Sequence, residues 1–318
     1  MKKLLLLLAI FTLLLTACGQ PATKLNVTKV GLLLPETVNE PIWGNKGYKG
    51  LLKIQSDLNA EVYYREGMKS KSDVRGALDE FKEIGVNLVF GHGSEYGTFF
   101  EEIHKEYPDM DFVYFNGNFA ADNVTSIKFE SYAMGFFGGM IAAKMSKTKH
   151  IGVIAAFSWQ PEIEGFIQGA EYQDPAVVIS VQYTKNWGNK EKAMTIYNEM
   201  ERAGVDVFYP AGDSFNLPLI EKVKEDGHYA IGYISDQSDL GESTVLTSTI
   251  QQVEKLYGII AGEYISGKFE HGIKTYDFKD GVISLGKLSP EIPEEYVIEI
   301  NKAVELYKLT GDLPSKNK

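Results

Sequence analysis

Four aromatic residues stand where they could hold a planar ring. Trp43 follows the first predicted strand, and Phe215, in the sequence AGDSFN, lies in the corresponding loop of the second half of the chain. Phe157 and Trp159 lie beside another such loop. Stacking on aromatic side chains contributes about 1–3 kcal/mol per base in nucleic-acid complexes. These aromatics could therefore sandwich a purine-like ring, and packing into the protein core is the alternative.

Polar residues in the neighbouring loops could bind the sugar that accompanies such a ring. Sugar hydroxyls need both donors and acceptors, which carboxylate, amide and ammonium groups supply. For each residue taken alone, a solvated loop residue is the default interpretation. The candidates in the loops at strand ends are Asn116, Asp213, Asp236, Gln237 and Lys279.

Patterns typical of catalysis or of cofactor binding are absent from the sequence. GHGSEYG, at residues 91–97, departs from the dinucleotide fingerprint, and a tight strand-to-helix turn is the alternative interpretation. No Walker loop or G-x-S-x-G elbow occurs, and the five histidines are too scattered for a zinc site. We therefore expect a binding protein and not an enzyme, without a cofactor or a metal ion.

The single cysteine, Cys18, closes an N-terminal apolar run. Residues 4–15 have the length of a signal-peptide core and are too short to span about 30 Å of hydrocarbon comfortably. The order Leu-Thr-Ala-Cys resembles the bacterial lipoprotein box, and an ordinary secretory signal is the alternative. We expect residues 1–17 to be a signal peptide, Cys18 to carry a lipid anchor, and residues 18–27 to be a tether. This places the chain at the extracytoplasmic face of the cell membrane.

The charge of the chain argues against direct binding to nucleic acid. Its formal net charge is −11 over 318 residues, and removal of two lysines with the signal peptide would make it more negative. Such a surface repels phosphate backbones, and the sequence contains no basic arm or stripe. No later segment is apolar for eighteen residues, so we expect no further membrane span.

The elements that must position these residues alternate along the chain. Short β-branched runs, such as residues 30–34, alternate with segments of helical spacing, which predicts parallel sheets covered by helices on both faces. The pattern occurs twice, since AGVDVFYPAGD in the second half parallels IGVNLVFGHGS in the first. We therefore expect an α/β protein of two doubly wound parallel-sheet lobes, with ligand loops at the carboxyl ends of the strands.

The sequence lacks a flexible linker between these halves, so short extended crossovers are expected. We expect the chain to cross between the lobes near Phe129, near Thr247 and again before a final strand pair within residues 275–287. The expected lobes are residues 28–129 with 248–274, and residues 130–247 with 275–318.

Several ordered motifs resemble those of one known family. They are the lipoprotein box, EPIWGNKGYKGL, YAMGFFGGMIAAKMSKTKHIGVIA, EIEGFIQGA, SDQSDL and VLTSTIQQVEKLYGII. Together they resemble the basic membrane lipoprotein family of nucleoside-binding receptors of ABC importers, and the similarity runs from Cys18 to about Gly286. The resemblance implies a type I periplasmic-binding fold with a hinge, a nucleoside-like ligand and an ABC permease as a partner.

The resemblance also identifies counterparts of the family's ligand-binding residues. It implies Trp43 as the first stacking aromatic, Phe215 as the second, and Lys279, in FKDG, as the family's lysine. Gly44 replaces a ribose-binding amide, whose contact is then lost or moves to Asn45.

Several carboxylates of the family's site are replaced. Leu34, Asn116 and Ile234 stand where the family carries aspartates, whereas Asp236 is retained within GYISDQ. These replacements imply that ribose recognition is weakened.

Two functions remain open from the sequence. The first is a solute receptor of an ABC nucleoside importer. The second, implied by similarity to a regulatory member of the family, is a signalling lipoprotein that promotes competence transcription indirectly, through a membrane signalling partner. An exported and anchored chain cannot reach a promoter itself.

Overall fold

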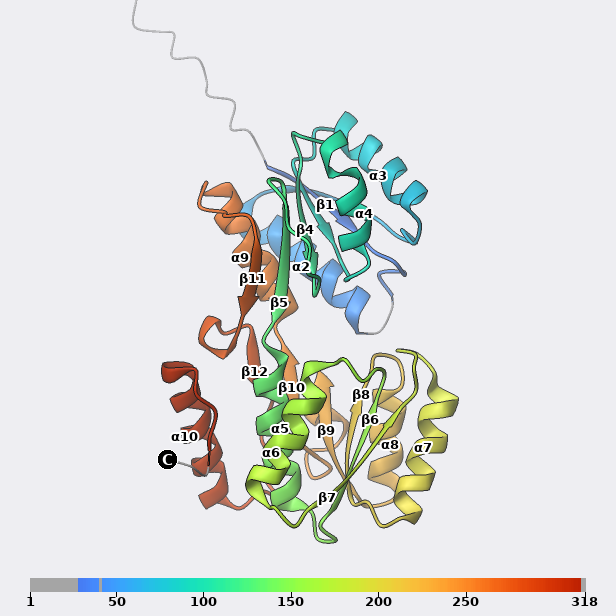
Figure 1. Ribbon diagram of the computed structural model, residues 1–318, viewed down its shortest axis with the longest axis vertical. Coiled ribbons are helices and arrows are strands. Elements are labelled where there is room, and N and C mark those ends of the chain that lie inside the picture. Colours follow the sequence, from blue (N-terminus) through green and yellow to red (C-terminus); the bar gives the residue numbers. More distant parts are fainter. Residues whose placement is uncertain (1–27, 40–41, 316–318) are drawn as a thin grey trace, which may run out of the picture.

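The computed structural model describes residues 28–39 and 42–315, which form two α/β lobes joined by a hinge (Figure 1). The predicted signal peptide, Cys18 and the tether lie outside the described residues. Within the described ranges, no helix combines the length and apolar character that a membrane span requires. The predicted fold class, two parallel-sheet lobes of the α/β type, is confirmed.

Lobe 1, the upper lobe in Figure 1, contains a sheet of six parallel strands in the order β11-β5-β4-β3-β1-β2. Its strands are β1 (Lys29–Leu33), β2 (Glu61–Arg65), β3 (Leu88–Gly91), β4 (Asp111–Phe115), β5 (Val124–Phe129) and β11 (Ile273–Tyr276). Its helices are α2 (Trp43–Leu58), α3 (Lys71–Glu83), α4 (Tyr96–Ile103), the 3₁₀ turn η1 (His104–Glu106) and α9 (Val253–Ile265).

Lobe 2 repeats this plan with one antiparallel edge strand, in the order β12-β10-β9-β8-β6-β7. Its strands are β6 (His150–Ala155), β7 (Val178–Tyr183), β8 (Val207–Ala211), β9 (Tyr229–Ile234), β10 (Val245–Gln251) and β12 (Ile283–Leu285). Its helices are α5 (Ser131–Met145), α6 (Pro161–Gln173), α7 (Lys190–Arg202), α8 (Asn216–Glu225), the 3₁₀ turn η2 (Ser238–Leu240) and α10 (Glu294–Thr310).

The helices follow local sequence signals. In α3, the Ser70 hydroxyl accepts a hydrogen bond from the Asp73 amide at 3.2 Å and caps the N-terminus. Val74 and Phe81 lie on the face of α3 that is buried against the sheet. Gly85 follows with a φ of +80°, a backbone conformation that glycine adopts without strain.

Glycines allow α5 and α6 to pack with their backbones in contact. A Cβ atom on Gly139 would lie 1.9 Å from the Phe166 carbonyl oxygen, and one on Gly169 would lie 1.9 Å from the Phe136 carbonyl oxygen. Both sites would overlap with main-chain atoms that cannot move aside independently. The motifs YAMGFFGGM and EIEGFIQGA therefore encode this close helix pair.

Three crossovers form the hinge and hydrogen-bond to one another. The Glu130 amide donates to the Tyr276 carbonyl at 2.9 Å, and the Gln252 amide donates to the Val282 carbonyl at 2.8 Å. The buried Gln251 amide side chain donates to the Ser131 hydroxyl at 3.2 Å. The first two crossovers are single residues between secondary-structure elements, Glu130 and Gln252, whereas the third, residues 277–282, contains a 3₁₀ turn and is not extended as predicted. Each crossover restrains the others.

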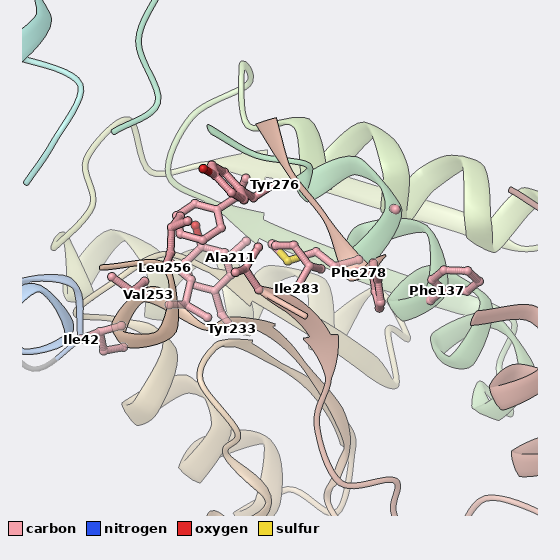
Figure 2. Close-up of a cluster of buried hydrophobic side chains, with 14 of the residues drawn as sticks. Ile42, Phe137, Ala211, Tyr233, Val253, Leu256, Tyr276, Phe278 and Ile283 are labelled. Carbon is pink, nitrogen blue, oxygen red and sulfur yellow. The ribbon is translucent and has the colours of Figure 1, made fainter. Parts of the chain in front are cut away.

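A continuous apolar cluster runs through this hinge. Figure 2 shows Ile42, Val253 and Leu256 of lobe 1 near Tyr233 and Ala211 of lobe 2. Two hinge side chains, Tyr276 and Phe278, belong to the same cluster and are almost fully buried.

Two of the predicted boundaries were wrong. The second crossing follows Gln251 and not Thr247, because β10 pairs with β9 as far as Ile250 and with β12 as far as Gln251, all in lobe 2. The expected final strand pair is not a pair: β11 adds to β5 in lobe 1, whereas β12 adds to β10 in lobe 2, and the 3₁₀ turn η3 (Phe278–Asp280) lies between them. The boundary at 274/275 therefore cuts through β11.

Candidate ligand-binding loops between the lobes

The carboxyl ends of the parallel strands in both sheets point toward the region between the lobes (Figure 1). Residues at these ends lie in loops or in the first turn of the following helix. Most of the residues predicted to bind a ligand lie there, including Trp43, Asn45, Asn116, Asp213, Phe215, Asp236 and Gln237. Lys279 lies in the hinge turn η3 instead.

Trp43 begins α2 and rests on an aromatic platform in its own lobe. Its ring stacks on His92, with ring centroids 4.3 Å apart and an interplanar angle of 15°. Phe115 and Phe129 contact the indole edge-on, at 5.7 and 6.5 Å between centroids. The indole Nε1 donates a hydrogen bond to the His92 carbonyl at 3.2 Å. Trp43 nevertheless stays partly exposed, so His92 supports the ring without enclosing it.

The hydrogen bonds of His92 fix its protonation state. Its Nε2 lies 2.7 Å from the Trp43 carbonyl oxygen, which can only accept, so Nε2 carries the proton. The Tyr257 hydroxyl, 2.9 Å from Nδ1, then donates to that nitrogen. Burial lowers the pKa of His92 to about 4, which keeps the ring neutral at physiological pH.

A row of glycines on α2 makes room for this platform. A Cβ atom on Gly47 would lie 2.6 Å from the His92 ring, and one on Gly50 would lie 2.6 Å from the Tyr257 ring. His92 and Tyr257 were not predicted as site residues. The spacing Gly44, Gly47, Gly50 could have indicated them, because it predicts a helix face against which bulky rings pack closely.

The other two lobe 1 residues have different environments. The Asn45 amide donates to the Val38 carbonyl at 3.4 Å, so it ties the preceding loop to α2. Asn116 is exposed after β4 and has a φ of +59°, a left-handed conformation that asparagine tolerates better than most residues.

Phe215 is buried in lobe 2 and does not face Trp43. Its side chain has no exposed surface and belongs to a core cluster with Ile154, Leu219 and Val245. The ring folds back over Gly212, where a Cβ atom would lie 2.1 Å from the ring edge. The core-packing alternative therefore describes Phe215, and its ring has no free face for stacking in this structure.

Asp213 and Asn216 flank Phe215 in the same loop. Asp213 is half-buried, and its negative charge contributes to the raised pKa of the Tyr233 hydroxyl, for which burial is the largest cause. Asn216 is fully buried, and the described residues supply no hydrogen-bond partner to either atom of its side-chain amide.

Asp236 and Gln237 bind the protein's own backbone. The two carboxylate oxygens of Asp236 accept hydrogen bonds from the amides of Ser238 at 3.1 Å and Lys287 at 3.0 Å. The Gln237 side-chain oxygen accepts from the Tyr233 amide at 2.9 Å. Both side chains thus hold the loop after β9 and the segment after β12 in place.

Lys279 is exposed and lies apart from the other predicted residues. It lines a hinge cavity of about 410 Å³ together with Glu130, Asp277 and Tyr307. None of the other predicted ligand-binding residues lines that cavity. Among the residues that the structure describes, no group of three or more histidine, cysteine or acidic side chains is arranged to hold a metal ion.

An aromatic triplet lies at the carboxyl ends of β6 and β7 in lobe 2. Phe157 stacks on Trp159 at 5.4 Å between centroids, and Trp187, which was not predicted, contacts both rings edge-on. Trp159 is 62% exposed. The buried Gln160 fixes the loop, because its side-chain oxygen accepts from the Phe157 amide and its nitrogen donates to Glu162.

Comparisons with known proteins identify the family. The sequence model of the Bmp family, described as ABC transporter substrate-binding protein PnrA-like, matches residues 27–314. The transcriptional activator protein med of Bacillus subtilis is 51% identical over 95% of both chains. Basic membrane protein A1 of Borrelia garinii is 26% identical over 95% of this chain and 92% of that protein.

Solved structures agree with this assignment. A transcriptional activator of the comK gene from Bacillus halodurans superposes with a TM-score of 0.86 and 46% identity, over 90% of this chain and all of that one. A solute-binding protein of an ABC transporter from Aeropyrum pernix shares the fold at 21% identity, with a TM-score of 0.71 over 91% of this chain and 82% of that one. The chain therefore belongs to the Bmp family of PnrA-like ABC transporter substrate-binding proteins, as its motifs predicted.

Proposed function

We propose that this protein is a membrane-anchored, extracytoplasmic binding protein that promotes competence transcription indirectly. The regulatory part of the proposal is supported by the 51% identity to a Bacillus transcriptional activator over nearly the whole chain. The anchor is supported by the lipoprotein-box sequence that ends at Cys18. An anchored chain would act on transcription through a membrane partner, and its net charge of −11 disfavours direct contact with DNA.

The observation that carries the proposal is the difference in exposure between Trp43 and Phe215, the two predicted stacking aromatics. Trp43 stays partly exposed on its His92 platform, whereas Phe215 is sealed in the core of lobe 2. Leu34 and Ile234, at positions where the resemblance expects aspartates, are also buried. We infer a pocket between the lobes in which a planar, nucleoside-like ligand stacks on Trp43 and in which ribose is poorly recognised.

The second candidate is the receptor of an ABC nucleoside importer. The family match favours it, and so does the three-crossover hinge, because lobes joined in this way can close on a solute. A receptor needs a permease partner, whereas a regulator acts without transport. If the protein is a receptor, deleting candidate nucleoside permeases would abolish its function. If the protein is a regulator, the same deletion would leave its competence phenotype intact.

Binding can be tested by calorimetry on the chain that follows Cys18. We expect inosine and guanosine to bind weakly or not at all. A planar ligand found by a thermal-shift screen should lose about 1–3 kcal/mol of binding energy in Trp43→Ala, the range of base stacking. Tyr64→Ala is the control, because this exposed aromatic lies within β2 and outside the loops at the strand ends. Tight binding of inosine that is unchanged in Trp43→Ala would contradict both the stacking role and the altered pocket.

The site of action can be tested with Cys18→Ala and with a chain that lacks residues 1–18. We expect Cys18→Ala to incorporate no labelled fatty acid and to accumulate as precursor. A competence reporter should be activated by the wild-type chain and not by the truncated chain retained in the cytoplasm. Activation by the truncated chain would refute indirect action from the membrane.

A further inference from the structure

The C-terminal helix α10 has one buried face and one exposed face that carries both apolar and charged side chains. Its buried face packs on lobe 2, where the Tyr307 ring lies 5.9 Å from the Phe137 ring and the Tyr296 hydroxyl donates to Gln173 at 2.9 Å. Figure 1 shows α10 at the outer edge of the molecule. Three large apolar side chains are exposed on this helix, namely Ile298 (63%), Leu306 (56%) and Leu309 (84%).

The spacing on the exposed face is that of a coiled-coil seam. Ile298, Lys302, Glu305 and Leu309 are separated by four, three and four residues, so they follow one another as d, a, d and a positions of a heptad. All four side chains are exposed. Their order is apolar, basic, acidic, apolar.

We propose that α10 pairs in antiparallel orientation with α10 of a second copy of this chain. In an antiparallel pair, a positions meet d positions, so Ile298 meets Leu309 of the partner subunit and Lys302 meets Glu305 of the partner subunit. Each contact occurs twice about the two-fold axis, as a self-complementary dimer interface requires. The seam then has apolar layers at both ends and two ion pairs in the middle.

The charges select this arrangement over the alternatives. A parallel pair would place Lys302 against Lys302 of the partner subunit, and like charges at such positions are destabilising. Glu305 already contacts Lys308 in its own helix at 2.6 Å, but it stays 67% exposed and can accept a second cation. An anionic lipid surface is disfavoured by Glu295 and Glu299, which flank the seam.

Disulfide cross-linking of the full chain in cells tests the pairing. Two differently tagged copies are co-expressed, one with Ile298→Cys and the other with Leu309→Cys, and Cys18 is retained in both. We expect oxidation to give a dimer that carries both tags. Two copies that both carry Ile298→Cys should not cross-link, because their seam positions are about 16 Å apart along the axis, beyond disulfide reach.

Charge reversal adds a test that a misfolded variant cannot mimic. Lys302→Glu or Glu305→Lys alone brings like charges together and should reduce the mixed cross-link by at least about tenfold, since 1.4 kcal/mol of repulsion suffices. The double variant should restore it. Leu52→Cys, at another exposed apolar position (40%), is the control for random collision. A missing mixed cross-link, an equal yield from Leu52→Cys, or no rescue in the double variant would overturn the proposal.

Discussion

Acidification should destabilise the protein through His92. Burial lowers the pKa of His92 to about 4 in the folded chain, whereas an unfolded histidine titrates near its ordinary value of 6.5. Below pH 6.5 the unfolded state takes up a proton that the folded state refuses, so the folded state loses relative stability as the pH falls. The shift of roughly 2.5 pH units corresponds to about 3 kcal/mol, of which about 2.5 kcal/mol is lost between pH 7.5 and pH 4.5.

Other groups titrate in the same range, so the assay must isolate His92. We would measure the free energy of unfolding in urea from pH 7.5 to pH 4.5 for the wild type and for His92→Gln. The variant should be less stable at pH 7.5, because it loses the stack on Trp43 and leaves buried hydrogen-bonding groups unpaired. As the pH falls, the difference in free energy of unfolding between the two proteins should shrink by about 2.5 kcal/mol.

A constant difference between wild type and His92→Gln across this range would refute the reasoning. It would mean that His92 titrates alike in both states, and that the ring is not a sealed, neutral support for Trp43. Tyr257→Phe is the companion variant, because it removes only the hydroxyl that donates to Nδ1. We expect it to cost about 1–3 kcal/mol at pH 7.5, the penalty for an unsatisfied buried acceptor.

Two further predictions concern structural residues. Gly139→Ala should destabilise the chain by at least about 1–3 kcal/mol in urea unfolding, because its Cβ would overlap the Phe166 carbonyl. Gly76→Ala, whose Cβ would meet no atom within 4 Å in α3, should instead gain up to about 1 kcal/mol; equal effects of the two changes would contradict the close packing of α5 and α6. Asp236→Ala should cost roughly 1–3 kcal/mol of stability, since two backbone amides lose their acceptor. A stable Asp236→Ala chain with impaired ligand binding would restore the ligand role that its contacts argue against.

Much of the fold could be predicted because its signals are local. Apolar runs with helical segments between them predict parallel sheets, and Gly85 ends α3 through its own left-handed backbone conformation. The signals that predict β11 and β12 as strands are also local, but the strands with which they pair are not determined locally. A strand pair was predicted within residues 275–287, whereas Asp280 and Gly281 belong to the hinge turn that sends the two strands into different sheets.

The candidate site was harder to predict because the burial of each side chain decides whether it is available to a ligand. The sequence predicted Phe215 and Trp43 in corresponding loops, but Phe215 follows β8, the counterpart of β3, whereas Trp43 follows β1. The Phe215 ring folds over Gly212 into the core. Asp236 is retained from the family motif, but its oxygens accept hydrogen bonds from the backbone amides of Ser238 and Lys287. The family resemblance identified positions, and only the three-dimensional contacts show which side chains remain available.

The strand order of lobe 1 has a consequence for how the chain folds during synthesis. β5 ends at Phe129, but its neighbour β11 begins only at Ile273. At ribosomal rates of about 5–20 residues per second, the edge of β5 stays without that neighbour for roughly 7–30 s. An unpaired edge of this kind can pair with other chains. Truncated chains that end before residue 273 should therefore aggregate more readily than the complete chain, although most of their lobe 1 sequence is present.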